Sequence, residues 1–361
     1  MTVRTLAIDL ALQRRRIARR FGDLATGAGL WAVIVGFCLW AAFAETDAFV
    51  VGLVVGSVLV LGAIGLTLIY GILKFAHFAH GDSMMLAAYV AFFVLTGTAV
   101  GARTDVSLPW SLDHLPKATT PIWDFSFGYG LLLAIPLAAL VTVAVFLLLE
   151  ALVYGPLRRR RAGIVIFAIA SLGVAIAMRS FILAVWGPSP RFYVQGIRPT
   201  IDLPFGPRIV TDQIFIFGVA VALVALVYLL LFRTRIGRAM RATADNAELA
   251  RVAGIDTDMV IRWTWVFSAA LVAIAGVLLG LQSQLKPELG FVLLLPLFAA
   301  TVLGGIGSPQ GALAGGFFVG IAQEVAVTFD FLSPGYKFSV AFVILIAVIL
   351  IRPRGLFGTQ T

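Results

Sequence analysis

The chain alternates between long apolar runs and short polar segments along nearly its whole length of 361 residues. Each apolar run has about 16 to 25 residues, close to the length that an α-helix needs to cross a hydrocarbon layer of about 30 Å. We therefore predict an all-α, polytopic bundle of roughly ten transmembrane helices (eight to ten), in which broken or re-entrant helices are allowed. The expected spans are 24–44, 49–73, 83–101, 127–155, 163–186, 212–232, 262–282, 290–306, 310–329 and 338–351.

The composition agrees with a protein whose main solvent is lipid. Hydrophobic residues make up 61% of the chain and charged residues 12%, compared with about 25% charged residues in an ordinary soluble domain. The net charge of +9 does not indicate nucleic-acid binding, because the basic residues lie at the ends of apolar runs. The single cysteine, Cys38, lies inside an apolar run and excludes both a disulfide framework and a CxxC metal cluster.

The positions of Lys and Arg predict the orientation of the chain. With the N-terminus inside, nineteen of the 27 Lys and Arg lie in inside segments and seven in outside loops, which predicts that both termini are cytoplasmic. The expected organisation is a basic cytoplasmic segment 1–23, one transmembrane domain 24–352 and a cytoplasmic tail 353–361. The Arg-rich start is similar to a signal peptide, but its apolar run is longer than usual, so we expect it to remain as an anchor.

The longest inside segment, residues 233–262, has too regular a pattern for a linker. Its sequence, RTRIGRAMRATADNAELARVAGIDTDMVIR, predicts two short helices. Asp245 is the expected N-cap of the second helix, Glu248 lies in its first turn and Gly254 ends it. Such a pair would form a small, rigid knob outside the membrane. The alternative is a solvated loop that only follows the positive-inside bias.

Several motifs occur in a fixed order along the chain. They are GLTLIYGILKFAHFAHGDSMMLAAYVAF at 65–92, GRAMRATADNAELARVAGI within the knob segment, AGVLLG at 275–280, TVLGGIGSPQGALAGGFFVGIAQ at 301–323 and RPRGLFG at 352–358. Together these motifs resemble the Liv-type permeases of branched-chain amino-acid ABC transporters, most of all the LivH half of the permease pair. The chain departs from that pattern at His77, where the family usually has Asn before its AHG element, and at Ala87, where Gly commonly precedes the Ala-Tyr pair.

The resemblance implies a permease subunit in the bacterial inner membrane, without catalytic residues or a bound cofactor. ATP hydrolysis would occur on separate ABC ATPase subunits, in agreement with the absence of a GxxxxGK[ST] motif from the sequence. The other implied partners are a sister permease and a periplasmic solute-binding protein. The cargo would be a branched-chain or related amino acid, with urea or a short amide as the alternative. The residues expected to couple the knob to the ATPase are Gly237, Arg238, Arg241, Asp245, Glu248, Arg251 and Gly254.

The segment KFAHFAHGD, residues 74–82, predicts a broken-helix turn at the inner end of the second span. In this interpretation His80, Gly81 and Asp82 form the turn, because Gly81 permits a chain reversal and Asp82 caps the next helix. Two histidines three residues apart with a nearby acid are also a weak metal-site pattern. We favour the turn and expect no metal.

Ionisable residues within lipid are costly, so Arg179 and Glu324 indicate a substrate path. We predict that the two pair in the resting state and offer an acceptor and a donor to the charged ends of an amino acid. Tyr70, His77 and Gln323 complete the candidate path. The alternatives are a purely structural ion pair, or an arginine whose head reaches outward to water.

Two further patterns concern packing and the outer face. Small residues repeat at four-residue spacing, for example Gly52 with Gly56 and Gly316 with Gly320, which predicts close helix contacts. The outer loops 102–126 and 187–211 are rich in Pro and aromatic residues, and they would either dock a partner or close the helix ends.

Two other classes of function fit the sequence less well. An ion-coupled secondary transporter would need several acids within the spans, and Glu324 alone qualifies clearly. A membrane-embedded enzyme would need a nucleophile and a base in a plausible arrangement, and the sequence offers none.

Overall fold

A computed structural model gives the fold of residues 28–100, 105–107, 111–194, 196, 198–202, 206–330 and 332–357. The predicted cytoplasmic segment 1–23 and the final residues of the tail, 358–361, lie outside this described part of the chain. Within it, helices dominate, and each of the ten predicted spans corresponds to a helix. They are Ala28–Ala44, α2 (Thr46–Leu73), α3 (His80–Thr96), α4 (Tyr129–Leu149), α6 (Ile164–Trp186), α7 (Thr211–Arg233), α10 (Thr257–Gln282), α11 (Leu289–Gly304), α12 (Pro309–Ala326) and α13 (Lys337–Ile351).

Six segments among the described residues are long and apolar enough to cross a membrane. Four of them are the helices α2, α6, α7 and α10. The other two are the stretch Tyr129–Arg159, which begins with α4, and the stretch Pro334–Ile351, which ends with α13. Ala28–Ala44, α3 and α11 are shorter apolar helices. The structure confirms an α-helical polytopic protein, and it supports six candidate spans where the apolar runs predicted about ten.

The helices form a buried centre and an exposed ring. The apolar windows of α2 and α10 are 72% buried, whereas those of α6 and α7 are 17% buried. The central α2 packs against α7, α10, α11 and α12. Ring helices such as α6, α7 and α13 expose Leu, Ile, Val and Phe side chains, which suits a surface that faces lipid.

Glycines bring α2 and α12 into backbone contact. A Cβ atom added to Gly52 would lie 2.6 Å from the Cα atom of Ile321, and one added to Gly320 would lie 2.4 Å from the Cα atom of Gly56. The predicted small-residue packing is therefore confirmed for these two helices. Because their backbones touch, α2 and α12 form a tight unit at the centre of the fold.

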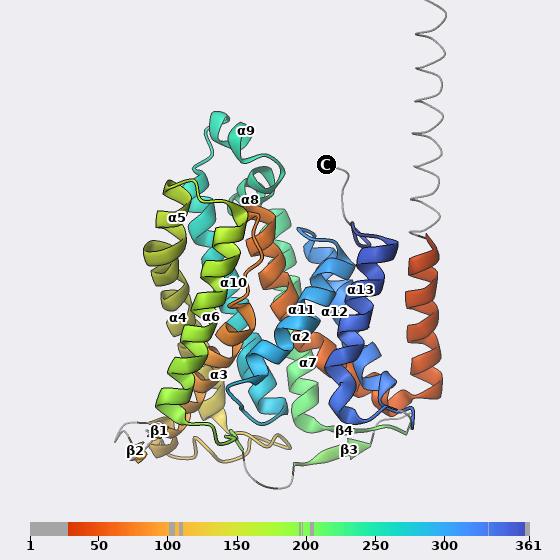
Figure 1. The fold of residues 1–361 in the computed structure, drawn as a ribbon. Coiled ribbons are helices and arrows are strands. Elements are labelled where there is room, and N and C mark those ends of the chain that lie inside the picture. The colour runs from red at the N-terminus through yellow and green to blue at the C-terminus, as the bar shows by residue number, and fades with distance from the viewer. Residues whose placement is uncertain are drawn as a thin grey trace, which may run out of the picture.

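The bundle has two different ends, which Figure 1 shows. At one end, α8 (Arg235–Asp245) and α9 (Ala247–Val252) stand beyond the bundle, and α13 ends on the same side. At the other end lie two antiparallel hairpins that the sequence did not predict. These pair β1 (Thr98–Val100) with β2 (Asp105–Ser107), and β3 (Thr200–Asp202) with β4 (Arg208–Val210). Single 3₁₀ turns at η1 (Leu112–His114) and η3 (Pro334–Tyr336) complete this end.

One long helix changes its winding near the end that carries the knob. After α4, a π-helical turn, η2 (Glu150–Tyr154), leads into α5 (Gly155–Arg159). Such single π-turns are rare and occur frequently at functional sites. This one places both Glu150 and Tyr154 in the buried interior.

Candidate functional site

Residues 74–79 turn the chain back into the bundle between α2 and α3. Lys74 ends α2 in a left-handed conformation (φ 58°), and its backbone N–H donates to the carbonyl of Tyr70. His80, at the start of α3, has Nε2 2.8 Å from the carbonyl oxygen of Gly62, eleven residues before the last residue of α2. At 1.5 Å per residue the chain has returned by roughly 16 Å. The predicted broken helix is therefore present.

The predicted roles of individual residues in that turn are wrong. The helix α3 starts at His80, so His80, Gly81 and Asp82 all lie in its first turn, and its N-cap residue, Ala79, makes no side-chain capping bond. The reversal occurs earlier, at Lys74, because that residue takes the left-handed conformation itself. Asp82 does not cap the helix; it bonds to another helix instead.

Gly81 serves a close approach between two short helices. A Cβ atom on Gly81 would lie 2.0 Å from the carbonyl oxygen of Gly290, and one on Gly290 would lie 2.5 Å from that of Gly81. Both glycines are in the first turn of their helices. The N-terminal ends of α3 and α11 therefore meet inside the bundle, where their dipoles favour negative charge.

Asp82 and Arg179 form a bidentate ion pair beside this junction. The Nε and Nη2 atoms of Arg179 each lie 2.9 Å from a carboxylate oxygen of Asp82. Asp82 is fully buried, whereas the side chain of Arg179 is 22% exposed. The guanidinium carbon also lies 4.6 Å from the ring centroid of Phe291. A carboxylate, a guanidinium and an aromatic ring thus meet where α3, α6 and α11 come together.

The predicted pair between Arg179 and Glu324 is wrong. Glu324 accepts a 2.6 Å bond from Nζ of Lys337, and the side-chain amide of Gln323 donates to the Lys337 carbonyl at 3.1 Å. Gln323 and Glu324 therefore fasten the end of α12 to the start of α13. Arg179 instead pairs with Asp82 of α3. The predicted path residues Arg179 and Glu324 therefore belong to separate groups of contacts.

His77 belongs to a buried cluster at the π-turn. Its Nε2 lies 3.1 Å from the hydroxyl of Tyr154, whose ring stacks on Trp265 with a 5.0 Å centroid separation. Trp265 donates from Nε1 to a carboxylate oxygen of Glu150 at 2.7 Å, and Arg158 bonds the other oxygen. The cluster links residue 77 to η2, α5 and α10. Its members Tyr154, Trp265 and Glu150 were not among the predicted site residues.

The segment outside the bundle folds into two helices, as predicted. Thr234 caps α8 by accepting from the N–H of Gly237 at 3.0 Å. Asn246 caps α9 by accepting from Leu249 N–H at 2.9 Å, so the predicted cap, Asp245, is wrong by one residue. Asn and Asp are about equally good caps, and α8 continues through Asp245. Glu248 does lie in the first turn of α9, and Gly254 (φ 85°) follows its end.

Three of the predicted coupling residues hold this knob, residues 235–254, on the bundle. A Cβ atom at Gly237 would lie 2.2 Å from the carbonyl oxygen of Leu230, so only glycine lets α8 pack so closely on α7. Arg241 bonds the carbonyl of Leu231, and Arg251 bonds Oγ1 of Thr257 at 3.0 Å. The knob is therefore fixed to both α7 and α10.

The outward surface of the knob combines charge with apolar side chains. Arg238, Asp245 and Glu248 are exposed. Leu249 and Val252 of α9 are 65% and 86% exposed, and the sequence interpretation did not single them out. Their i, i+3 spacing on a polar helix is the signal that could have identified them. Leu249 and Val252, together with the exposed charged residues, form the candidate contact surface of the knob.

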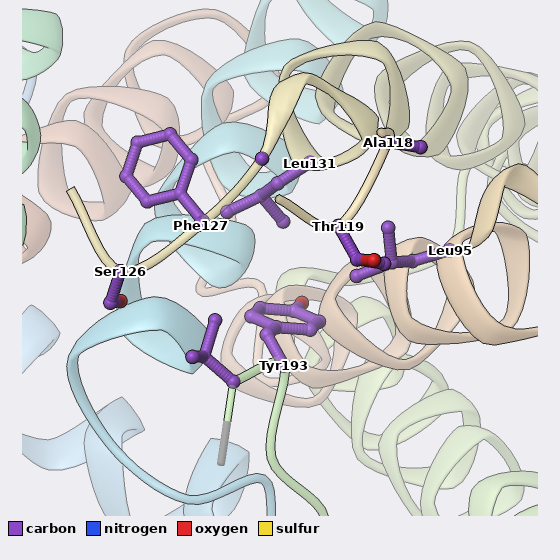
Figure 2. A pocket seen from close by; sticks show the side chains of 9 residues that line it. Leu95, Ala118, Thr119, Ser126, Phe127, Leu131 and Tyr193 are labelled. Atoms are coloured by element: carbon purple, nitrogen blue, oxygen red, sulfur yellow. The ribbon is translucent and has the colours of Figure 1, made fainter. Parts of the chain in front are cut away.

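The opposite end of the bundle contains a pocket of about 210 Å³ between the two outer loops. Figure 2 shows Phe127, Leu131 and Tyr193 around one hollow. The walls come from the ends of α3 and α4, from the first outer loop and from the second. The lining residues are Leu95, Ala118, Thr119, Ser126, Phe127, Gly128, Leu131, Tyr193 and Val194.

Hydrogen bonds hold both outer loops onto the helices. The N–H of Ser126 donates to Asp212, at the start of α7, at 2.8 Å. The hydroxyl of Tyr193 donates to the carbonyl of Ala88 in α3 at 2.7 Å. The outer loops thus close the helix ends, which was one of the two predicted roles.

A family model described as "Branched-chain amino acid transport system / permease component" matches residues 48–349. This chain belongs to that permease family. The match covers nearly all of α2, every helix from α3 to α12 and most of α13. It therefore includes the broken segment (residues 74–79), the ion pair and the knob. Members of the family are transport permeases and not enzymes.

Curated relatives of this permease agree with the family assignment. The permease is 34% identical to the high-affinity branched-chain amino acid transport system permease protein BraD of Pseudomonas aeruginosa, over 85% of this chain and 94% of that protein. It is 32% identical to LivH of Escherichia coli, over 85% of this chain and 93% of LivH. A probable LivH of Methanocaldococcus jannaschii is 29% identical over 85% of this chain. No solved structure gives a significant match.

Proposed function

We propose that this permease is the membrane-spanning subunit of an ATP-driven importer that carries branched-chain or related amino acids across the bacterial inner membrane. Family membership and the names of BraD and LivH support the cargo class. ATP is hydrolysed on separate ATPase subunits, and this chain holds no cofactor. Its own task is to move amino acids that a periplasmic solute-binding protein delivers.

The observation that carries this proposal is the knob. It stands beyond the bundle (Figure 1), and three side-chain or backbone contacts fix it to the ends of α7 and α10. The exposed Leu249 and Val252, beside the charged Glu248, combine an apolar centre with a polar rim, as protein interfaces do. An ATPase subunit seats on this surface. The knob end of the bundle, where α13 also ends, is then cytoplasmic, and both termini lie there.

The opposite end receives the solute-binding protein. Hydrogen bonds of Ser126 to Asp212 and of Tyr193 to Ala88 fasten the described parts of the outer loops to the helices, and the docking face lies around the 210 Å³ pocket (Figure 2). Loop residues that are already bonded to helices lose less conformational entropy when a partner binds.

A sister permease covers the face that carries Arg179. The side chain of Arg179 is 22% exposed and Phe291 is 49% exposed in the single chain. A guanidinium facing lipid would be costly, so this face turns toward another subunit or a polar path. The amino acid passes along this face, with its carboxylate near the partly exposed guanidinium of Arg179.

Reconstitution of the complete transporter tests the proposal. The permease, its sister, the ATPase subunits and the binding protein are placed in proteoliposomes, and leucine uptake is measured. We expect uptake to need ATP on the ATPase side, to need the binding protein on the other side, and to survive ionophores that collapse proton and sodium gradients. Uptake that follows an ion gradient and ignores ATP would refute the proposal.

A variant of the knob tests the ATPase contact. Leu249→Glu combined with Val252→Glu places two charges in the apolar centre of the surface, and we expect the ATPase subunits to be lost on co-purification. Thr120→Glu adds a charge to an exposed position in the first outer loop and serves as the control. If the double variant retains its ATPase subunits in wild-type amounts, the knob is not their contact site.

A further inference from the structure

A lysine from the start of the broken segment reaches the knob. Nζ of Lys74 donates to the carbonyl oxygen of Ala244 at 2.9 Å, between residues 170 positions apart in sequence. Ala244 lies in the last turn of α8, where carbonyl groups lack partners within the helix and the helix dipole is negative. The ammonium group therefore binds the knob at the junction between α8 and α9.

Lys74 has a backbone conformation that glycine or asparagine adopts at lower cost than lysine. Its φ of 58° is left-handed, a conformation that costs a non-glycine residue energy and that usually selects Gly or Asn at a helix end. A lysine at this position indicates that its side chain has a use that offsets the backbone cost.

The segment that follows Lys74 contacts α6, η2 and α10. The ring of Phe75 is 5.2 Å from that of Phe167 in α6, and His77 contacts Tyr154 and Trp265. The N–H of Phe78 donates to Oγ of Ser171 at 3.0 Å. In the described structure, side chains make most of the polar contacts that hold residues 74–79, so the segment can move without breaking a backbone ladder.

The same short stretch leads directly to the ion pair. Asp82, which binds Arg179, lies only eight residues after Lys74, and eight residues reach at most about 28 Å. Residues 74–82 thus join the knob at one end of the bundle to the carboxylate that faces Arg179.

We propose that Lys74 is a positioning residue that transmits movements of the knob to residues 75–82 and through them to the Asp82–Arg179 pair. The inference rests on the proposed function, because it takes the knob as the ATPase contact. When the ATPase subunits displace α8, the bonded Lys74 moves the broken segment, and the contacts of His77 and Asp82 change together.

Transport per ATP hydrolysed tests this inference in the complete reconstituted transporter. Lys74→Met keeps the apolar stem and removes the donor. We expect normal assembly and normal basal ATP hydrolysis, but about fivefold or more less leucine transported per ATP. Lys74→Arg, which can still donate to the carbonyl, should restore most of that ratio. Arg160→Met removes an exposed positive charge at the end of α5 and should leave the ratio unchanged.

Amide hydrogen exchange gives a second, local measurement. In the wild-type transporter, we expect a non-hydrolysable ATP analogue to change exchange both in α9 and in residues 75–80. In Lys74→Met the change in α9 should remain while the change in residues 75–80 is lost. A Lys74→Met transporter with the wild-type ratio and the wild-type exchange response would overturn the inference. If the wild-type complex shows no ATP-dependent uptake, the proposed function itself has failed.

Discussion

Replacing Arg179 with methionine leaves the Asp82 carboxylate buried without its partner. Asp82 is 0% exposed and cannot reach water, while two 2.9 Å bonds to Arg179 are lost. Breaking a buried ion pair costs about 3–5 kcal/mol. The dipole of α3 partly compensates the orphaned carboxylate, so we expect Arg179→Met to destabilise the permease by about 3 kcal/mol.

The reverse replacement should cost less. In Asp82→Asn the guanidinium of Arg179, which is 22% exposed, can extend along α6 toward the water beyond its end at Trp186, as long basic side chains do. The loss is then close to that of the charged hydrogen bonds alone, about 1.5 kcal/mol. The double variant, Asp82→Asn with Arg179→Met, leaves no unpaired charge at this position and should be more stable than Arg179→Met.

Titration with SDS in mixed micelles measures these differences. A change of 3 kcal/mol corresponds to roughly a hundredfold change in the unfolding equilibrium constant. Arg208→Met breaks a pair whose side chains are 78% and 71% exposed and should have little effect. The reasoning is refuted if Asp82→Asn is the more destabilising single change, or if the double variant is as unstable as Arg179→Met.

Uptake by the same variants separates structure from transport. If the pair only supports the fold, the double variant regains uptake together with stability. If the pair takes part in the substrate path, the double variant regains stability but not leucine uptake. Wild-type uptake by Arg179→Gln would remove Arg179 from the path. Glu324→Gln should lower stability through the lost contact with Lys337 and leave uptake per folded protein unchanged.

Two further changes test the packing around the site. In Gly81→Ala the new Cβ atom would lie 2.0 Å from a carbonyl oxygen of α11, so we expect a loss of about 1–3 kcal/mol or more in SDS titration; Gly173→Ala, with nothing within 4 Å of its Cβ position, should have no such effect. In Trp265→Phe the buried Glu150 loses its 2.7 Å bond, which should cost about 1.5–3 kcal/mol by the same titration, whereas Trp263→Phe, at a 36% exposed position, should cost clearly less.

The sequence predicted the positions of the helices well. It predicted less well how far each helix extends across the bundle. Apolar runs mark helices because a backbone in lipid must satisfy its own hydrogen bonds. The predicted spans left residues 74–82 and 283–289 outside helices, but the pattern does not show how deep in the bundle they lie: His80 reaches Gly62 of α2, and Leu285 is fully buried. The helix α3 runs from His80 to Thr96, where Gly97 ends it in a left-handed conformation (φ 67°), whereas the prediction placed this span at 83–101.

Partners of charged residues were the least predictable part of the site. The sequence identified Arg179 and Glu324 as unusual. The acid beside Arg179 is decided by the contact between α3 and α6, which the local sequence pattern does not reveal. The cap of α9 was misplaced by one residue because Asp245 and Asn246 are both good caps. The segment 233–262 was nevertheless predicted to contain two short helices, since that pattern is local.

The two kinds of contact in the core divide the bundle into a stiff part and an adjustable part. Backbones of α2 and α12 touch at glycines, and such close-packed surfaces have no room to slide without large van der Waals penalties. Residues 74–79 are held instead by the aromatic rings of Phe75 and His77 and by single side-chain hydrogen bonds, which can change partners at lower cost. A force applied at the knob through Lys74 therefore displaces the broken segment before it displaces α2. The Asp82–Arg179 pair, which follows the broken segment in sequence, is then the next contact to change.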